Sequence, residues 1–360
     1  MKIGLLTYHR SHNYGALLQA VALRFYLQQK GHEVYYVDYW PNYHKEMYKI
    51  FDKYSYNRRS FKGKIGFVFA FLISYKRKRL RIRAFESFIN TFITPYCRPY
   101  NDVEHYDVVI YGSDQIWRKQ ERLSNKYNEV YFGINNLKVD KNISYAASMG
   151  VINPTLDEKL FLYESLTRFY GLGVREESLR KLLVDVGLSN VTLNVDPTLL
   201  LRKEQWNKIL NTKNVIGKRY ALLYDLHPDS FDNRNLIDYC RNNSLELIKL
   251  EGNAKLPEKN SYSVEGPEMM VSLIAYAEIV FTSSFHGLVF SLLYHKELYA
   301  SFKTNSDRAR TLMMAVGIER RLINYSDYYA DSTPINYSYV DSVINIMANE
   351  SVTYLSSVLK

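Results

Sequence analysis

Residues 280–293 combine small hydroxyl side chains, a histidine and a glycine between two apolar segments. The first segment is typical of a buried parallel strand and the second of a helix, and open α/β sheets place their ligands at such strand ends. Free backbone N–H groups at a helix start suit an anion, and His286 is a titratable group beside them. Ser283, Ser284 and Gly287 therefore predict an anion-binding turn around His286. A capped core helix with one hydrogen-bonded histidine would give the same pattern.

Two further strand ends carry charged side chains. The apolar run 105–112 is followed by Ser113 and Asp114, and the short run 171–174 is followed by Arg175. Asp114 could accept a hydrogen bond from a hydroxyl group or act as a base, and it could equally cap a helix. Arg175 is a candidate anion ligand, although ion pairing with the glutamates next to it explains this arginine at least as well.

The amino-terminal segment has the order of a Rossmann-like unit. Residues 2–7 predict a strand, residues 15–29 a helix and residues 33–39 a second strand. The loop between the first strand and the helix lacks the GxGxxG pattern of dinucleotide-binding folds. Asn13 and Gly15 open the helix and could hydrogen-bond a substrate, whereas an asparagine that caps the helix would look the same.

Strands and helices alternate in both halves of the chain, and a polar stretch at 202–218 separates the halves. We therefore expect an α/β protein with two Rossmann-like domains, one at 1–201 and the other at 202–360, the second ending in a helix. A length of 360 residues is also too great for a single typical core.

The composition indicates a globular protein in a reducing compartment. Hydrophobic residues make up 47% of the chain and charged residues 23%. The two cysteines, Cys97 and Cys240, lie far apart and in no metal-ligand spacing, so we expect neither a disulfide nor a metal site. The sequence has no secretory signal and no apolar segment long enough to cross a bilayer, which predicts a cytoplasmic protein.

The net charge of +10 lies in one segment of the chain. Residues 58–83 contain ten basic side chains and no acidic one, and they fall within 41–90, a segment that interrupts the alternation in the first domain. This segment also contains an apolar run at 65–74. Residues 58–83 therefore predict a surface that lies on an anionic membrane, with a solvated basic face over a core-packed helix as the alternative. We expect no nucleic acid to bind, because no recognised binding motif accompanies the charge.

Six short motifs occur in an order that resembles the polysaccharide pyruvyl transferase family over about residues 3 to 325. The motifs are NYGA at 13–16, GSDQIW at 112–117, SYAAS at 144–148, VRE at 174–176, DPTLL at 196–200 and SFHG at 284–287. The resemblance implies two Rossmann-like domains facing a cleft, as in glycosyltransferases of the B type. It also implies phosphoenolpyruvate as the donor and no cofactor or metal. The product would be a cyclic pyruvate ketal on two hydroxyls of a sugar, with phosphate released.

The resemblance ties one motif to donor binding, with one departure in this chain, and the chemistry of the transfer suggests roles for further residues. The family has Arg-x-His-Gly in its second domain, whereas this chain has Ser284 at the arginine position, so we expect Arg308 to supply the missing cation. His286 would be the general acid and Asp114 would orient or deprotonate the attacking hydroxyl. The expected donor ligands are Arg175, Ser283, Ser284, Gly287 and Arg308. The expected acceptor ligands are Asn13, Gly15 and Ser113.

The expected acceptor is a lipid-linked oligosaccharide, which would place the enzyme on the inner face of the cell membrane. One alternative is a glycosyltransferase of similar fold that uses a nucleotide sugar. Such an enzyme needs a ribose-binding carboxylate, for which Glu265 and Glu268 are the candidates although they flank a helix start. The other alternative is a sugar- or lipid-binding scaffold that has lost donor chemistry. The serine in place of arginine at position 284 supports this alternative.

Overall fold

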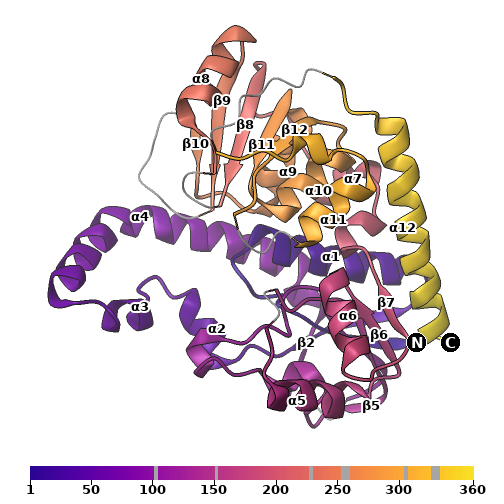
Figure 1. Ribbon diagram of the computed structural model, residues 1–360. Coiled ribbons are helices and arrows are strands. Elements are labelled where there is room, and N and C mark those ends of the chain that lie inside the picture. The colour runs from indigo at the N-terminus through magenta and orange to yellow at the C-terminus, as the bar shows by residue number, and fades with distance from the viewer. Residues whose placement is uncertain (101–103, 151–152, 227–229, 253–259, 304–306, 326–332) are drawn as a thin grey trace.

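The computed structural model in Figure 1 describes residues 1–100, 104–150, 153–226, 230–252, 260–303, 307–325 and 333–360. The chain forms two parallel sheets with helices against their faces, and a long helix, α12 (Tyr337–Val358), follows the second sheet. This confirms the predicted α/β fold of two Rossmann-like domains with a carboxyl-terminal helix.

The sheet of the first domain has seven strands in the order β3-β2-β1-β4-β5-β6-β7, and neighbouring strands pair in parallel. The strands are β1 (Lys2–Leu6), β2 (Glu33–Asp38), β3 (Cys97–Pro99), β4 (His105–Tyr111), β5 (Lys138–Ala147), β6 (Gly171–Val174) and β7 (Val191–Leu193). The order of the strands reverses at β1, because β2 and β3 lie on one side of it while β4 to β7 lie on the other. The switch point is therefore between β1 and β4. Loops at such a switch point diverge and leave a crevice, so the residues after β1 and after β4 meet at one edge of the sheet.

The second domain repeats this arrangement with five parallel strands in the order β10-β9-β8-β11-β12. The strands are β8 (Tyr220–Asp225), β9 (Glu246–Glu251), β10 (Ser261–Tyr262), β11 (Ile279–Thr282) and β12 (Glu297–Ala300). The helices are α8 (Asn233–Asn242), α9 (Pro267–Tyr276), α10 (Phe285–Leu293) and α11 (Asp307–Ala315). Here the switch point lies between β8 and β11, so α10 begins at the crevice of this domain.

Helix α1 (Tyr14–Gln29) lies between the two domains, as Figure 1 shows. Most of its side chains are buried, because one side covers the first sheet and the other contacts α9. The Tyr14 hydroxyl also donates to the carbonyl of Glu265 in the second domain, at 3.2 Å. The start of α1 is therefore held against the second domain rather than exposed on the first.

The other helices of the first domain divide into two groups. Helices α5 (Leu156–Leu166) and α6 (Glu177–Asp185) follow strands of the sheet, and α7 (Lys203–Leu210) connects the domains. Helices α2 (Asn42–Met47), α3 (Lys53–Asn57) and α4 (Phe61–Phe92) form the segment that interrupts the alternation, and we call them the arm. No helix in the described part of the chain is long and apolar enough to span a membrane.

Helix α12 returns from the second domain to the first. The Tyr354 hydroxyl donates to the carbonyl of Ser144 on β5 at 2.7 Å, and Ser351 accepts from the backbone N–H of Val195 at 2.9 Å. Figure 1 shows this helix running past both domains and ending beside the amino terminus. The two domains are therefore connected by α12 as well as by α7.

Candidate active site

The turn between β11 and α10 is built from hydrogen bonds among its small residues. Ser284 caps α10, since its hydroxyl accepts from the backbone N–H of Gly287 at 3.3 Å. Ser283 donates to the Asp225 carboxylate at the end of β8 and accepts from the N–H of Leu226 at 2.8 Å. A side chain on Gly287 would meet Thr282 Oγ1 at 2.2 Å. These residues shape the turn and fix the start of α10.

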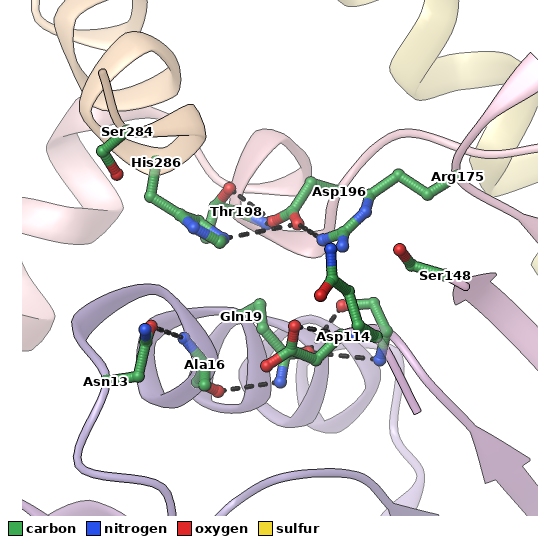
Figure 2. Close-up of polar contacts among 12 residues, drawn as sticks. Asn13, Ala16, Gln19, Asp114, Ser148, Arg175, Asp196, Thr198, Ser284 and His286 are labelled. Carbon is green, nitrogen blue, oxygen red and sulfur yellow. Dashed lines mark hydrogen bonds and ion pairs between the residues drawn. The ribbon is translucent and has the colours of Figure 1, made fainter. Parts of the chain in front are cut away.

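His286 projects from this turn across the domain boundary, as Figure 2 shows. It is 8% exposed, and its Nδ1 lies so close to α1 that a Cβ atom built on Gly15 would be 1.9 Å away. Its Nε2 lies 3.5 Å from Oδ2 of Asp196. Only a glycine at position 15 leaves room for the imidazole, which explains why the NYGA motif of the first domain accompanies the SFHG motif of the second.

Asp196 connects His286 to the cations of the site. Its Oδ2 accepts from Arg175 at 2.6 Å, while its Oδ1 accepts from the N–H and the hydroxyl of Thr198 at 3.0 and 2.7 Å. Burial opposes ionisation of this carboxyl, but His286, Arg175 and Thr198 hold the pKa of Asp196 well below its usual range. Asp196 was not among the predicted site residues. The only signal in the sequence was its position at a strand end in the DPTLL motif.

Two arginines approach the same aromatic ring. The guanidinium of Arg175 lies 5.5 Å from the ring centroid of Phe285, and that of Arg308 lies 4.6 Å from it. Burial and the nearby charge of Arg175 lower the pKa of Arg308 to about 10. Within the described residues, Nε and Nη2 of Arg175 and Nη1 of Arg308 make no hydrogen bond. Two neighbouring cations with unused donors suit a ligand that carries two negative charges.

Ion pairing with a neighbouring glutamate was the alternative to an anion-binding role for Arg175. The structure gives Arg175 a closer contact with Asp196, 21 residues later in the chain, at 2.6 Å, while Glu176 lies 3.7 Å away. Glu176 instead accepts from the hydroxyl of Ser148 at 2.5 Å. Arg175 is thus held by a buried pair that spans β6 and the loop after β7.

On the first domain, Asp114 and Asn13 lie at the edge where β1 and β4 end. Asp114 Oδ1 accepts from the N–H of Gln115 at 2.7 Å, and Asn13 caps α1 by accepting from the N–H of Ala16 at 3.1 Å. Ser113 is fully buried, and its hydroxyl donates to Gln19 at 2.6 Å. Asn13 therefore caps α1 and also lines the cleft. Ser113 is buried and does not line it.

One cavity of about 210 Å³ gathers most of the predicted residues from the two domains. Those that line it are Asn13, Gly15, Asp114, Ser283, Ser284, His286 and Arg308. Arg175 and Asp196 line an adjoining cavity that shares Phe285 and Arg308 with the first. Gly287 and Ser113 line neither cavity. The arrangement brings an imidazole, two guanidinium groups and the carboxylate of Asp114 together in one cleft.

Two clusters of potential metal ligands lie elsewhere in the described residues. His9, Asp38 and Cys97 form the first, but Arg10 already donates to both oxygens of Asp38 at 2.6 Å. Burial also raises the pKa of the Cys97 thiol to about 12, which disfavours the thiolate that metals bind. The second cluster, at His105, Asp107 and Asp140, is at the surface. Neither cluster contributes a residue to the cleft.

These features define a two-domain α/β protein with an imidazole, two guanidinium groups and a carboxylate at its interdomain cleft. The family model for polysaccharide pyruvyl transferase matches residues 13–300, and the chain belongs to this family. Membership implies a transferase of polysaccharide biosynthesis. No curated protein matches the sequence.

Solved structures of similar overall shape have low sequence identity. The UDP-GlcNAc 2-epimerase of Methanocaldococcus jannaschii, in complex with UDP-GlcNAc and UDP, is 12% identical with a TM-score of 0.46, covering 97% of this chain and 93% of that chain. The trehalose-6-phosphate synthase OtsA is 9% identical with a TM-score of 0.47, covering 100% and 99%. Similarities of this size say nothing about the substrate of this chain.

Proposed function

We propose that the protein transfers the pyruvyl group of phosphoenolpyruvate to two hydroxyls of a sugar in a lipid-linked polysaccharide precursor. The product is a cyclic ketal, and phosphate is released. The observation that carries the proposal is the pair of arginines beside His286 in the cleft, Arg175, which is buried, and Arg308, which is half-buried. Phosphoenolpyruvate carries a carboxylate and a phosphate, and the unused N–H groups of these arginines can hold both.

Arg308 takes the place of the arginine that the family has at position 284. Ser284 cannot supply a charge, and its hydroxyl is engaged in capping α10. Arg308 reaches the same region from α11, and its contact with Phe285 holds the guanidinium near the start of α10. The donor site thus keeps two arginines, one from each domain.

His286 is the proposed general acid. The chemistry requires a proton on the methylene carbon of the donor as a sugar oxygen bonds to C2, and a positioned acid contributes roughly 10²–10⁴-fold to such a step. Asp196 is placed to hold a proton on Nε2, which leaves Nδ1, next to Gly15, for proton transfer. Asp196 is therefore a positioning residue, because it acts through the imidazole.

Asp114 is the proposed base for the acceptor. It lines the cavity opposite His286, and its second carboxylate oxygen can accept a hydrogen bond from a sugar hydroxyl. The first hydroxyl attacks C2 and loses its proton, and the second then displaces phosphate and closes the ring. One hydroxyl proton in effect replaces the proton that His286 gives to the methylene carbon, and the other leaves with phosphate, so the reaction balances with the chain's own side chains.

The assay that tests this proposal supplies phosphoenolpyruvate labelled in the pyruvyl group and a galactose-containing lipid-linked acceptor. Phosphate release with transfer of label to the acceptor is the expected result. Sugar transfer from a nucleotide sugar would instead identify a glycosyltransferase, and the absence of both reactions would indicate a scaffold. The structure gives the glycosyltransferase no support, because neither Glu265 nor Glu268 lines the cleft.

A further inference from the structure

The two halves of helix α4 in the arm lie in opposite environments. The carboxyl-terminal half of α4 is part of the core, where Phe85, Phe88 and Ile89 are buried. Figure 1 shows the amino-terminal half of α4 projecting beyond both sheets, with α3 beside it. The projecting half carries the apolar run 65–74 that the sequence analysis identified, so the surroundings of that run decide its role.

The inner side of the projecting half packs on α3 and the segment before it. Phe51 meets Phe67 and Phe71 with ring centroids 5.4 and 5.1 Å apart, and Tyr56 lies 5.9 Å from Phe67. These aromatic contacts cover the inner face of the helix. The apolar side chains on the outer face consequently receive no cover from the arm.

The outer face forms a continuous exposed apolar stripe. Its side chains are between 38% and 80% exposed, and they recur at the three- and four-residue spacing of one helix face. The stripe consists of Phe61, Ile65, Val68, Phe69, Leu72 and Ile73. It extends about 18 Å along the helix. An uncovered apolar stripe of this kind marks a surface that contacts something else.

Basic side chains border the stripe at both of its ends. Lys62 lies at the first turn of α4, and Lys76, Arg79 and Arg83 follow the last apolar residue. All four are exposed, and none has an ion-pair partner in the described part of the chain. The segment 58–83 contains no acidic residue that could neutralise them.

We propose that the outer face of α4 docks on the surface of an anionic lipid bilayer. The stripe would lie among the acyl chains near the headgroups, and the four bordering cations would pair with lipid phosphates. Charge selects this occupant over a second copy of the chain. Two copies joined through the stripe would bring two sets of these four exposed cations together and repel each other. The core-packed alternative describes the inner face and the carboxyl-terminal half of α4, but not the outer face, where the stripe is exposed.

The arm is tied firmly to the cleft, so docking would also orient the active site. Arg81, about two turns beyond the stripe, is buried and donates to the Tyr14 hydroxyl and to the carbonyls of Ser263 and Gly252, each at 2.9 Å. Tyr14 begins α1, directly before Gly15 at the cleft. A bilayer under α4 would therefore hold the cleft at a fixed distance from membrane-borne sugar acceptors, which extends the proposed function.

The experiment measures co-sedimentation of the whole protein with phosphatidylcholine vesicles, with and without phosphatidylglycerol. We expect binding only when phosphatidylglycerol is present and weaker binding at high salt. Phe69→Asp with Leu72→Asp should lower the partition coefficient roughly tenfold or more, because both side chains would otherwise enter the acyl region. Charge reversal by Lys76→Glu and Arg79→Glu should give a loss of similar size.

Leu160→Asp is the matched control, since Leu160 is 57% exposed on α5, away from the arm. This variant should bind like the wild type. Unchanged thermal unfolding of the stripe variant would show that the fold is intact.

Equal binding to both vesicle types, no binding at all, or full binding by the Asp variants would overturn the proposal. If the wild type formed a dimer that the same Asp substitutions dissociate, and did not bind vesicles, the stripe would join two copies instead. None of these results depends on catalysis, so the docking proposal can fail while the proposed transfer reaction stands.

Discussion

The cleft and the arm both gather basic side chains, but they do so in opposite surroundings. In the cleft, Arg175 and Arg308 are held beside Phe285, and Asp196 neutralises part of their charge. On the arm, Lys76 and Arg79 are exposed and border an apolar stripe. Fixed and buried cations can select one small anion by geometry, whereas exposed cations respond only to the density of negative charge on a surface. Under the two proposals, the same residue types serve recognition in one region and adhesion in the other.

The largest effect is expected at His286, the proposed general acid. His286→Ala should reduce turnover by roughly 10²–10⁴-fold, because the proton donor is lost. The affinity for phosphoenolpyruvate should change much less, since the arginines remain. Steady-state phosphate release and direct titration of the donor separate the two quantities. Turnover equal to that of the wild type would remove His286 from the reaction.

Asp196 should matter for stability as well as for positioning. Asp196→Asn leaves Arg175 without its buried partner, so we expect a loss of about 3 kcal/mol in the free energy of unfolding, measured by chemical denaturation. Asp238→Asn is the control, because its carboxylate is 55% exposed and pairs with Arg241 on the protein surface. A loss no greater than that of the control would show that the buried pair contributes little.

The pH dependence of stability follows from the same carboxylate. The pKa of Asp196 is depressed in the folded protein, so its contribution is fully present above the unfolded value of about 3.9 and is lost as the pH falls below it. Unfolding measured between neutral and strongly acidic pH should therefore show a steeper acid decline for the wild type than for Asp196→Asn. Parallel curves would contradict the assignment of a charged Asp196.

Arg308 tests whether the cleft needs its second cation. Arg308→Met should weaken binding of phosphoenolpyruvate by roughly 10–100-fold, the usual range for a charge-assisted hydrogen bond. Arg310→Met, on the exposed side of the same helix, provides a matched control. Equal donor affinity in the two variants would mean that another group replaces the family arginine. Vesicle binding should be unaffected in both, which separates the cleft from the arm.

The smallest effect is expected from a single methyl group at the domain boundary. Gly15→Ala places a Cβ atom against the imidazole of His286, so the ring must shift, and turnover should fall about tenfold. Gly66→Ala on the arm is the control, because a Cβ there meets no atom within 4 Å. Similar turnover for the two variants would show that the contact between α1 and His286 does not set the position of the ring.

The sequence was sufficient for the fold. The alternation of apolar runs and helices predicted both sheets, and the motif order predicted that Asn13, Asp114 and His286 would meet. The partner of Arg175 was missed, because Asp196 reaches it through tertiary structure while Glu176 is merely adjacent in sequence. Local spacing cannot distinguish a neighbour in the chain from a neighbour in space.

The arm shows a second limit of sequence patterns. The apolar run 65–74 could belong to a core helix or to a surface helix, because its composition is the same in both cases. The difference depends on which face α3 covers, and Phe67 and Phe71 take that contact while Phe69 and Leu72 do not. Only the packed structure shows which side chains remain exposed.

A crystal structure with phosphoenolpyruvate bound tests the central claim most directly. The account predicts the carboxylate and phosphate within hydrogen-bond distance of Arg175 and Arg308, and the imidazole of His286 beside the methylene carbon. A donor bound outside the interdomain cleft, or a His286 ring that has no contact with it, would contradict the account.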